Sequence, residues 1–327
     1  KNVSRRHAEF FMEGGHLFIR DFGSTNGTYV NHRRITRDTR LESGDVIHFG
    51  SLEFRLCRSE GSETGSGDKT MVFEGERAIL RSSHLVESAF REMIAKRAVR
   101  PYFQPIVKLS TMRAIGYEVV GRGFHKGLPS APGELFKIAQ TIGAEARLSQ
   151  LFRYEGVRLG RMLPGTPNLF VNSHPAEMYQ LSLLESLKEV RELAPAHPIT
   201  LEISERSVSD LSLMKQLRTA LRDLNIGLAY DDFGAGQARF VELIEVPPDF
   251  LKFDLTLIRN IHNAPKRFHH MVRTLVRMAG DLDIDTVAEG VESKEELDVC
   301  IEMGFNYAQG FFLGEPSPPP RSKKEKP

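Results

Sequence analysis

Short apolar runs alternate with helical patterns over most of this sequence, and that rhythm limits the possible fold more than any other feature. Eight runs read as strands: Tyr102–Val107, Ile115–Val120, Asn168–Asn172, Thr200–Ile203, Gly227–Tyr230, Phe250–Phe253, Asp285–Ala288 and Tyr307–Phe312. Helical spacing lies between most of them: Gly133–Ile142, Ala144–Arg161, Pro175–Glu192, Val208–Leu224, Leu255–Gly280 and Glu295–Met303. Strands that alternate with helices form parallel sheets. Eight of them within about 230 residues fit a closed (β/α) barrel.

The first two strands depart from this pattern, because only residues 108–114 separate them. A connection of that length permits a hairpin but no parallel crossover, which needs a dozen or more residues. We therefore expect the barrel to open with an antiparallel pair.

Polar side chains stand at or near the carboxyl end of seven of these strands. They are Glu118, Asn172, Glu202, Asp231 with Asp232, Lys252 with Asp254, Glu289, and Gln309. In a barrel those ends converge on one face, where active sites are built. Gathered carboxylates disfavour each other's ionised form unless a counter-charge is present. Oxygen ligands favour Mg²⁺ or Mn²⁺, and adjacent carboxylates suit a bridge between two metals of the kind that attacks phosphodiesters.

Each of these residues also has a simpler interpretation. A single Glu at a strand end is usually a solvated loop residue, Asp231–Gly236 could be a turn, and Lys252 could lie on the surface. The coincidence at seven equivalent strand ends favours a shared site.

The first part of the chain has a different rhythm. Short alternating runs are separated by turn residues: His7–Met12, Leu17–Asp21, Gly27–Val30, Asp45–Phe49 and Leu52–Cys57. This pattern predicts an all-β sandwich, although five strands are fewer than such a domain normally has. Ser, Gly and Glu dominate from Arg58 to Asp68, which indicates a flexible linker, and the proline- and lysine-rich end indicates a disordered tail.

Composition narrows the class of protein. A chain of 327 residues holds about two domains. The net charge of +1 argues against a protein that coats nucleic acid or a membrane surface. Two cysteines, Cys57 and Cys300, make no disulfide framework, so we expect a cytoplasmic protein. The first residues are neither a signal peptide nor an initiator Met, so we expect a longer natural protein.

Seven segments of the second part match one family in order. They are Phe103–Val107, Gly116–Val120 with Arg122, Leu201–Glu205, Asp231–Gly234, Leu251–Asp254, Ala288–Glu292 and Gln309–Gly310. Together they resemble the EAL-domain cyclic di-GMP phosphodiesterases, over roughly residues 80–316. The resemblance implies a TIM-like barrel with an antiparallel first strand, and hydrolysis of cyclic di-GMP to linear pGpG. Dimerisation is common in this family, which leaves a homodimer open.

The resemblance also implies roles for individual residues. Two Mg²⁺ or Mn²⁺ ions per site would be held by Glu118, Asn172, Glu202, Asp231, Asp232 and Glu289. Residues with a catalytic part would be Glu118, Asp232, Lys252 and Glu289. Substrate contacts would come from Gln104, Arg122, Asp254 and Gln309, and loop support from Glu205 and Glu292.

Some positions depart from the family pattern. The Glu-Ala-Leu signature is Glu118-Val119-Val120 here, which keeps the carboxylate. Gly121 and Gly123 replace bulky residues and are expected to loosen a substrate wall, and Glu315 replaces a basic residue. No metal ligand is lost, so an active enzyme is favoured. The alternative is a catalytically weak cyclic di-GMP receptor that acts as a phosphorylation-dependent adaptor.

The first part resembles a forkhead-associated (FHA) domain. The matching segments are Val3–Ala8, Asp21–Asn31 and Leu41–Asp45. The resemblance implies binding of a phosphothreonine peptide, or of a phosphorylated partner protein, through Ser4, Arg5, Thr25 and Asn26. The family's leading strands would precede Lys1, so we expect a partial domain. The expected organisation is 1–57 partial FHA domain, 58–79 linker, 80–316 EAL domain and 317–327 tail.

Overall fold

The computed structural model describes residues 7–31, 33–42, 45–49, 52–56, 86–178, 180–207, 210–236 and 240–319. The chain divides into two compact units, Lys1–Leu85 and Val86–Pro327. The expected linker 58–79 lies outside the described residues, as do Cys57 and residues 320–327 of the expected tail.

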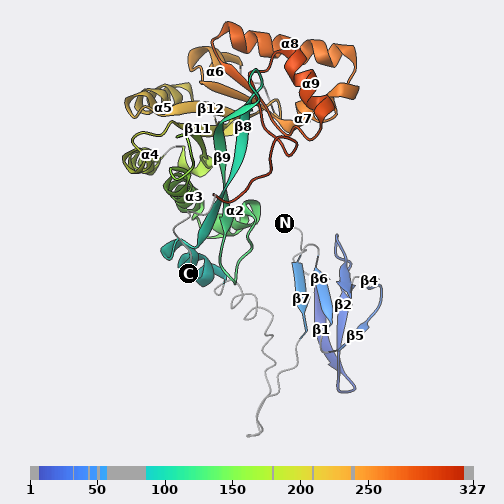
Figure 1. Cartoon of the computed structure of the whole chain (residues 1–327). Helices are drawn as coiled ribbons and strands as arrows, with labels where there is room; N and C mark the ends of the chain where they lie inside the picture. Colours follow the sequence, from blue (N-terminus) through green and yellow to red (C-terminus); the bar gives the residue numbers. More distant parts are fainter. Residues whose placement is uncertain are drawn as a thin grey trace, which may run out of the picture. The chain divides into compact units, whose positions relative to one another are not determined.

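The second unit is a closed barrel of eight strands (Figure 1). Its strands are β8 (Val99–Lys108), β9 (Arg113–Gly123), β10 (Asn168–Asn172), β11 (Ile199–Ser204), β12 (Gly227–Phe233), β13 (Phe250–Phe253), β14 (Asp285–Ala288) and β15 (Tyr307–Ala308). From β9 to β15 neighbours pair in parallel, whereas β8 runs antiparallel to both β9 and β15. The expected barrel with an antiparallel first strand is confirmed.

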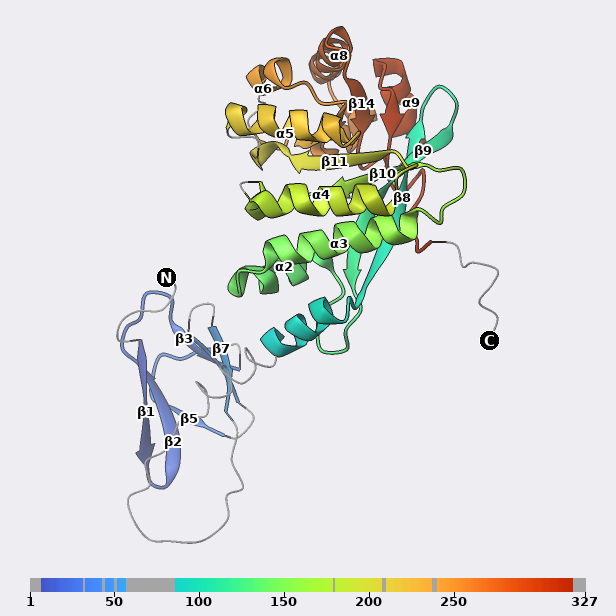
Figure 2. The same cartoon turned by 90° about the vertical axis from the view of Figure 1, so that its left-hand side faces the viewer.

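Helices cover the outside of the barrel (Figure 2). They are a helix over residues 86–95, α2 (Pro132–Thr141), α3 (Glu145–Gly160), α4 (Leu181–Leu193), α5 (Leu211–Asp223), α6 (Phe240–Glu245), α7 (Leu255–Ile258), α8 (Lys266–Asp281) and α9 (Lys294–Met303). Single 3₁₀ turns are η1 (Pro175–Glu177), η2 (Glu205–Ser207) and η3 (Ile261–Asn263). Helix α8 is amphipathic, because Val272, Val276 and Ala279 recur at helical spacing and form its buried face.

Two of the expected helices are interrupted. The expected helix Pro175–Glu192 is η1 followed by α4, because Gln180 between them has an extended backbone. The expected helix Leu255–Gly280 is α7, η3 and α8. Asn260 takes a left-handed conformation between the first two, and Pro265 disfavours a helical residue before it.

The last barrel strand is shorter than expected, since it ends at Ala308. The backbone then turns tightly against another loop: a Cβ added at Gly310 would lie 2.1 Å from the carbonyl oxygen of Val291. Farther on, Ser317, which the sequence analysis placed in the tail, exchanges two backbone hydrogen bonds with Phe103 of β8. The ordered chain therefore continues past the expected end of the barrel domain.

Two apolar layers stabilise the barrel. Strand residues that point outward, such as Leu169, Leu201 and Leu228, join the core between sheet and helices. The barrel interior is filled by side chains from alternate strands, as is typical of this fold. That interior layer consists of Ile106, Phe170, Ala229 and Val287.

The first unit consists of two small sheets, β1-β2-β5 and β4-β3-β6-β7. The strands are β1 (Ala8–Glu13), β2 (His16–Asp21), β3 (Thr28–Val30), β4 (Arg33–Arg34), β5 (Thr39–Leu41), β6 (Val46–Phe49) and β7 (Leu52–Arg55). Their shared core is Ile19, Val30, Ile35, Leu41 and Ile47. The expected sandwich is confirmed, with β4 and β5 added to the five expected strands.

Candidate functional site

The barrel brings the polar strand-end residues together one layer above its apolar interior. Side chains two positions apart on a strand point to the same face. The positions beyond the apolar layer hold Asn172 on β10, Asp231 on β12 and Glu289 directly after β14. On the antiparallel β8 the equivalent residue comes earlier in the sequence and is Gln104. The intervening strands add Glu118, Glu202 and Lys252, and Gln309 follows directly after β15.

Lys252 lies at the centre of this group and is fully buried. Its Nζ is 2.7 Å from Glu202 Oε1 and 2.8 Å from Glu289 Oε1. Asp231 Oδ1 follows at 3.0 Å and Glu118 Oε2 at 3.8 Å. One buried cation is therefore shared by four carboxylates, and Lys252 is not the surface residue that the simpler interpretation allowed.

Burial and mutual repulsion shift the protonation of these carboxyl groups. Burial raises the pKa of Glu202 and of Glu289 well above the usual value, against the opposing attraction of Lys252. Burial likewise raises the pKa of Asp231. For Glu118 burial is outweighed by Lys252, Gln309 and Asn172, so its pKa is lowered. Burial also opposes the charge on Lys252, but the surrounding carboxylates outweigh it and raise its pKa well above the usual value.

A backbone irregularity places Asp231 and Asp232 side by side. Consecutive residues of a regular strand point to opposite faces. Here the pairing of β12 with β13 shifts register between Tyr230 and Phe233, and Asp232 has φ 61°. Such a bulge re-aims side chains. As a result, ligand atoms of Asp231, Asp232 and Glu289 lie within 4.8 Å of one another.

These residues fit a divalent cation. The donor atoms are carboxylate and amide oxygens, which Mg²⁺ and Mn²⁺ prefer. Glu202 Oε1 and Asp231 Oδ1 face the Lys252 ammonium, whereas the buried Glu202 Oε2 accepts no hydrogen bond from any described residue. A buried acceptor without a donor is costly, and a bound cation would satisfy it.

A row of amides lines one side of the group. Glu118 accepts hydrogen bonds from Asn172 Nδ2 at 3.0 Å and from Gln309 Nε2 at 2.6 Å. Gln309 also donates to Gln104 Oε1 at 3.0 Å, and Gln104 in turn donates to the carbonyl of Gly314 at 3.2 Å. Asn172 and Gln309 therefore orient Glu118 directly, and Gln104 holds Gln309 in turn.

Two further residues that are expected to contact substrate have contacts within the protein. Arg122 lies on the same face of β9 as Glu118, four residues farther along, with its guanidinium carbon 5.1 Å from the centre of the Tyr102 ring. Asp254 is buried and caps helix α7, accepting hydrogen bonds from the backbone N–H and hydroxyl of Thr256. The capping role of Asp254 was missed in the sequence, where Asp followed by Leu255-Thr256 is a recognisable cap.

The two residues expected to support loops differ. Glu205 Oε2 accepts a hydrogen bond from the N–H of Gly234 at 3.3 Å, within the loop that follows Asp231 and Asp232. Glu292 is about half exposed and pairs with Arg259 Nη2 at 3.0 Å. A different residue, the buried Glu296, holds the backbone of the loop that carries Glu292, because it accepts from the N–H groups of Asn260, Glu292 and Ser293.

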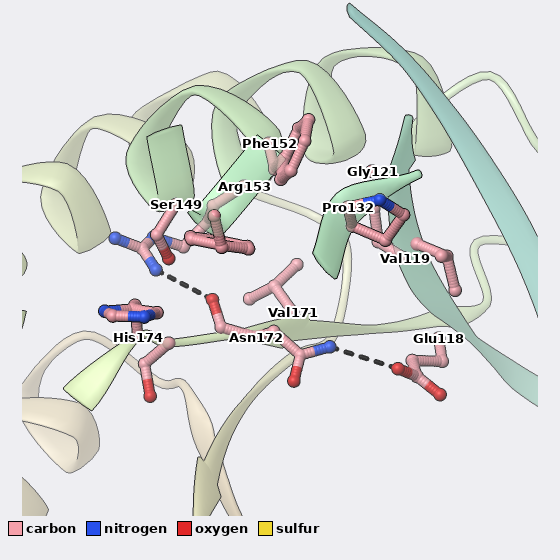
Figure 3. Close-up of a pocket in the computed structure, with 13 residues that line it drawn as sticks. Glu118, Val119, Gly121, Pro132, Ser149, Phe152, Arg153, Val171, Asn172 and His174 are labelled. Carbon is pink, nitrogen blue, oxygen red and sulfur yellow. Dashed lines mark hydrogen bonds between the residues drawn. The ribbon is translucent and has the colours of Figure 1, made fainter. Parts of the chain in front are cut away.

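A cavity of about 270 Å³ opens beside Glu118 and Asn172 (Figure 3). Its wall includes Gly121, Phe152 and Arg153. At both glycines the space that a Cβ would fill is already occupied. A Cβ at Gly121 would lie 2.2 Å from the Phe152 ring, and one at Gly123 would lie 2.8 Å from Leu135.

Two contacts near the site were not expected from sequence. Ser204 Oγ donates to Asp232 Oδ2 at 3.2 Å, and its position between the strand-end Glu202 and Glu205 could have suggested a role. Arg153 reaches the end of β10 from helix α3. No local signal marks that contact, because 19 residues separate its partners.

In the first unit, Thr25 and Asn26 are exposed on the loop between β2 and β3. Asp21 organises this loop by accepting from the N–H groups of Gly23 and Ser24 and from the hydroxyls of Ser24 and Thr28. Burial opposes ionisation of Asp21, but these hydrogen bonds outweigh it and lower its pKa to about 2. Ser4 and Arg5, the other expected peptide contacts, lie outside the described residues.

The fold and site define a class of barrel proteins with an acidic, lysine-centred cluster at the carboxyl ends of the strands. Comparison with models of protein families identifies the family. The EAL domain model matches residues 87–316. The chain therefore belongs to the EAL domain family. The FHA domain model matches residues 1–50.

Individual relatives support the same assignment. Cyclic di-GMP phosphodiesterase RocR of Pseudomonas aeruginosa is 32% identical over 225 residues, which are 66% of this chain and 57% of that protein. A manganese/cyclic di-GMP complex of Klebsiella pneumoniae BlrP1 is 28% identical with a TM-score of 0.60, covering 67% of this chain and 56% of that one. The Xanthomonas citri FimX EAL domain shares the fold, with a TM-score of 0.68 at 20% identity over 74% of this chain and 97% of that one.

The match spans only part of the curated relatives, since it covers 57% of RocR and 43% of the probable cyclic di-GMP phosphodiesterase PdeN of Escherichia coli. Within the described ranges, no helix combines the length and the apolar character needed to cross a bilayer.

Proposed function

We propose that this chain hydrolyses one phosphodiester bond of cyclic di-GMP and releases linear pGpG. The observation that carries the proposal is the buried Lys252 ammonium surrounded by four carboxylates at the carboxyl end of an EAL-family barrel. The relatives add support, because RocR is named a cyclic di-GMP phosphodiesterase and the BlrP1 complex holds manganese and cyclic di-GMP. In this proposal residues 80–316 form the phosphodiesterase domain.

Two divalent cations, Mg²⁺ or Mn²⁺, would bind to the acidic group. The first set of ligands would be Glu118, Asn172, Glu202 and Asp231. The second set would be Asp231, Asp232 and Glu289. Two cations bound there would neutralise charge on the phosphoryl group and lower the pKa of an attacking water.

The side chains would perform the remaining tasks. Lys252, held protonated by its carboxylate neighbours, would donate to the attacking water or to a phosphoryl oxygen and stabilise the developing negative charge. Gln104 and Gln309 would orient the substrate, since their amides already form a hydrogen-bonded row with Glu118. The planar guanidinium of Arg122 would suit a phosphate of the same substrate.

A cyclic di-GMP receptor without turnover is the second candidate. Glu315 favours it, because an exposed carboxylate follows Gly314, the residue whose carbonyl accepts from Gln104. Negative charge at that point would weaken the attraction of an anionic substrate.

The test is incubation of the purified chain with cyclic di-GMP and Mg²⁺ or Mn²⁺, with pGpG followed by chromatography. Glu118→Ala is the matched control, because it removes one ligand and leaves the strand intact. Product from the parent and none from the variant supports the enzyme. Bound cyclic di-GMP without product supports the receptor, and neither binding nor product overturns both.

For the first unit we propose recognition of a phosphothreonine peptide or a phosphorylated partner protein. The support is the exposed loop that carries Thr25 and Asn26 and is held in place by Asp21. Fluorescence anisotropy with matched phosphorylated and unphosphorylated peptides tests it, with Asn26→Ala expected to weaken binding and Asp38→Asn as a surface control.

A cytoplasmic location and a homodimer stay predictions.

A further inference from the structure

Arg153 of helix α3 is a buried cation beside the site. Its side chain has no exposed surface, and neither has that of Glu177 in η1, its ion-pair partner. Arg153 lines the cavity beside the end of β10 (Figure 3). Glu177 belongs to η1, which follows β10 in the chain.

The guanidinium of Arg153 connects three elements. Nη2 donates to Glu177 Oε2 at 2.5 Å, and Nε donates to the hydroxyl of Ser186 in α4 at 3.0 Å. Nη1 donates to the backbone carbonyl of Asn172 at 2.9 Å, which Figure 3 shows as a dashed line. The third bond is the important one, because it fixes the strand end that carries Asn172.

Glu177 holds the same segment from the other direction. Its Oε1 accepts from the backbone N–H of His174 at 3.0 Å, two residues after Asn172. The His174 ring stacks on Phe136 with the ring centres 4.8 Å apart. Arg153 of α3 therefore holds residues 172–177 at both ends: it donates to the carbonyl of Asn172 at one end and pairs with Glu177 at the other.

Stability alone does not account for a charged pair at this position. Apolar residues of similar volume often replace a buried ion pair with no loss of stability. The end of β10 borders the cavity on the side of Glu118 and Gly121, so no side chain packs against it from that side. A directional hydrogen bond can hold the strand end where packing does not. The carboxamide of Asn172 nevertheless meets Glu118 Oε1 at 3.0 Å.

We propose that Arg153 and Glu177 are positioning residues that hold Asn172 in place as a metal ligand. This inference rests on one part of the proposed function, namely that Asn172 is a ligand of a divalent cation. Outer contacts of this kind typically change metal affinity by about 10- to 100-fold when removed. The ion pair acts through the backbone of Asn172 and touches neither metal nor substrate.

The experiment measures Mn²⁺ affinity of the full chain by electron paramagnetic resonance of the free ion. Arg153→Met combined with Glu177→Leu removes both charges and leaves no buried charge unpaired. We expect cooperative unfolding, Mn²⁺ binding weakened by about 10- to 100-fold, and hydrolysis that recovers largely at saturating Mn²⁺. Unchanged affinity, within about twofold, would overturn the inference.

Two further variants separate positioning from folding. In an Asn172→Ala background the same double substitution should weaken Mn²⁺ binding no further, because effects transmitted through one residue are not additive; an additional tenfold loss would overturn the inference. Arg153→Lys keeps the charge but loses the planar fork, so an intermediate loss is expected even if the double variant does not fold.

Arg218→Leu is the matched control. It breaks the bidentate pair with Asp249, which precedes β13 at the opposite end of the barrel. We expect lower stability with unchanged Mn²⁺ affinity. If the parent binds Mn²⁺ but forms no pGpG, the proposed function fails, and the Mn²⁺ affinities of the variants still test the inference about Arg153 and Glu177. If the parent binds no Mn²⁺, that inference is overturned.

Discussion

Lys252 and Glu202 form an ion pair of 2.7 Å in which neither side chain has any exposed surface. Three further carboxylates share the same ammonium group. The acidic cluster therefore carries its own counter-ion, so the folded chain does not depend on bound metal for all of its charge compensation.

Replacement of Lys252 by Met should abolish most activity. The substitution keeps an unbranched side chain but removes the ammonium group that we propose stabilises charge on the phosphoryl group, so we expect kcat to fall by about 10²- to 10³-fold. Steady-state hydrolysis at saturating Mn²⁺ measures it. Lys215→Met, which alters an exposed pair with Glu245, is the control and should keep parental activity. A loss of less than about threefold in Lys252→Met would contradict the assigned role.

Removal of divalent metal should lower the thermal stability of the barrel. A ligand that binds only the folded state adds about 2.7 kcal/mol at a concentration of 100 Kd. We expect Tm to fall in chelator and to return with Mn²⁺, as followed by circular dichroism. The Asp231→Asn variant lacks a ligand shared by both expected sites, so its Tm should respond weakly. Equal responses of variant and parent would argue against these ligands.

Substitutions of Asp232 should separate charge from backbone conformation. Asn tolerates the left-handed conformation observed here, so Asp232→Asn should retain stability and lose activity. A β-branched residue in this conformation costs about 1–2 kcal/mol, so Asp232→Val should lose both. Urea unfolding and hydrolysis assays measure the two effects. Equal stability of the two variants would show that the bulge imposes no such requirement.

Introduction of a bulky side chain at Gly121 should be destabilising. Gly121→Leu would place its Cβ 2.2 Å from the Phe152 ring, and overpacking of this kind typically costs about 1–3 kcal/mol. Phe152→Ala in the same chain should recover part of that loss by making room. Denaturant unfolding of both single variants and the double variant completes the cycle, and additive effects would contradict direct competition for the space.

The loop that carries Thr25 and Asn26 should lose stability in acid through Asp21. A carboxyl group whose pKa is lowered on folding stabilises the folded state above its unfolded pKa of about 3.9. That contribution falls as pH drops from about 4 towards the folded value of about 2. Hydrogen exchange of residues 21–28 should show weaker protection in Asp21→Asn than in the parent at neutral pH, with the difference shrinking below about pH 4. The exposed Asp38→Asn variant should differ little.

The barrel strands were largely predictable because they are continuous apolar runs. Strands β10, β13 and β14 have the bounds expected from the sequence. Helix α6 and strands β4 and β5 were missed because elements of two to six residues carry too little periodicity to be distinguished from loops. The interruptions around Gln180 and Asn260 depend on backbone conformations that the apolar pattern does not encode.

The candidate site could be predicted as a set of residues but not as an arrangement. Strand-end positions were enough to group Glu118, Glu202 and Lys252, because parallel strands end on one face. The bulge at Asp232 and the pair of Arg153 with Glu177 could not be foreseen. The first is a change of register between two strands, and the second is a tertiary contact across 24 residues.

The reversed direction of β8 also determines where the chain enters the barrel. Val99, the first residue of β8, pairs with Gly123, the last residue of β9, at the end where the carboxylates gather. In a barrel with eight parallel strands the first residue would lie at the opposite end, a strand length away from the carboxylates. Here the helix over residues 86–95 leads directly to the end of the barrel that carries the carboxylates, where its Phe90 and Met93 share a core with Phe152, a wall of the cavity beside Asn172.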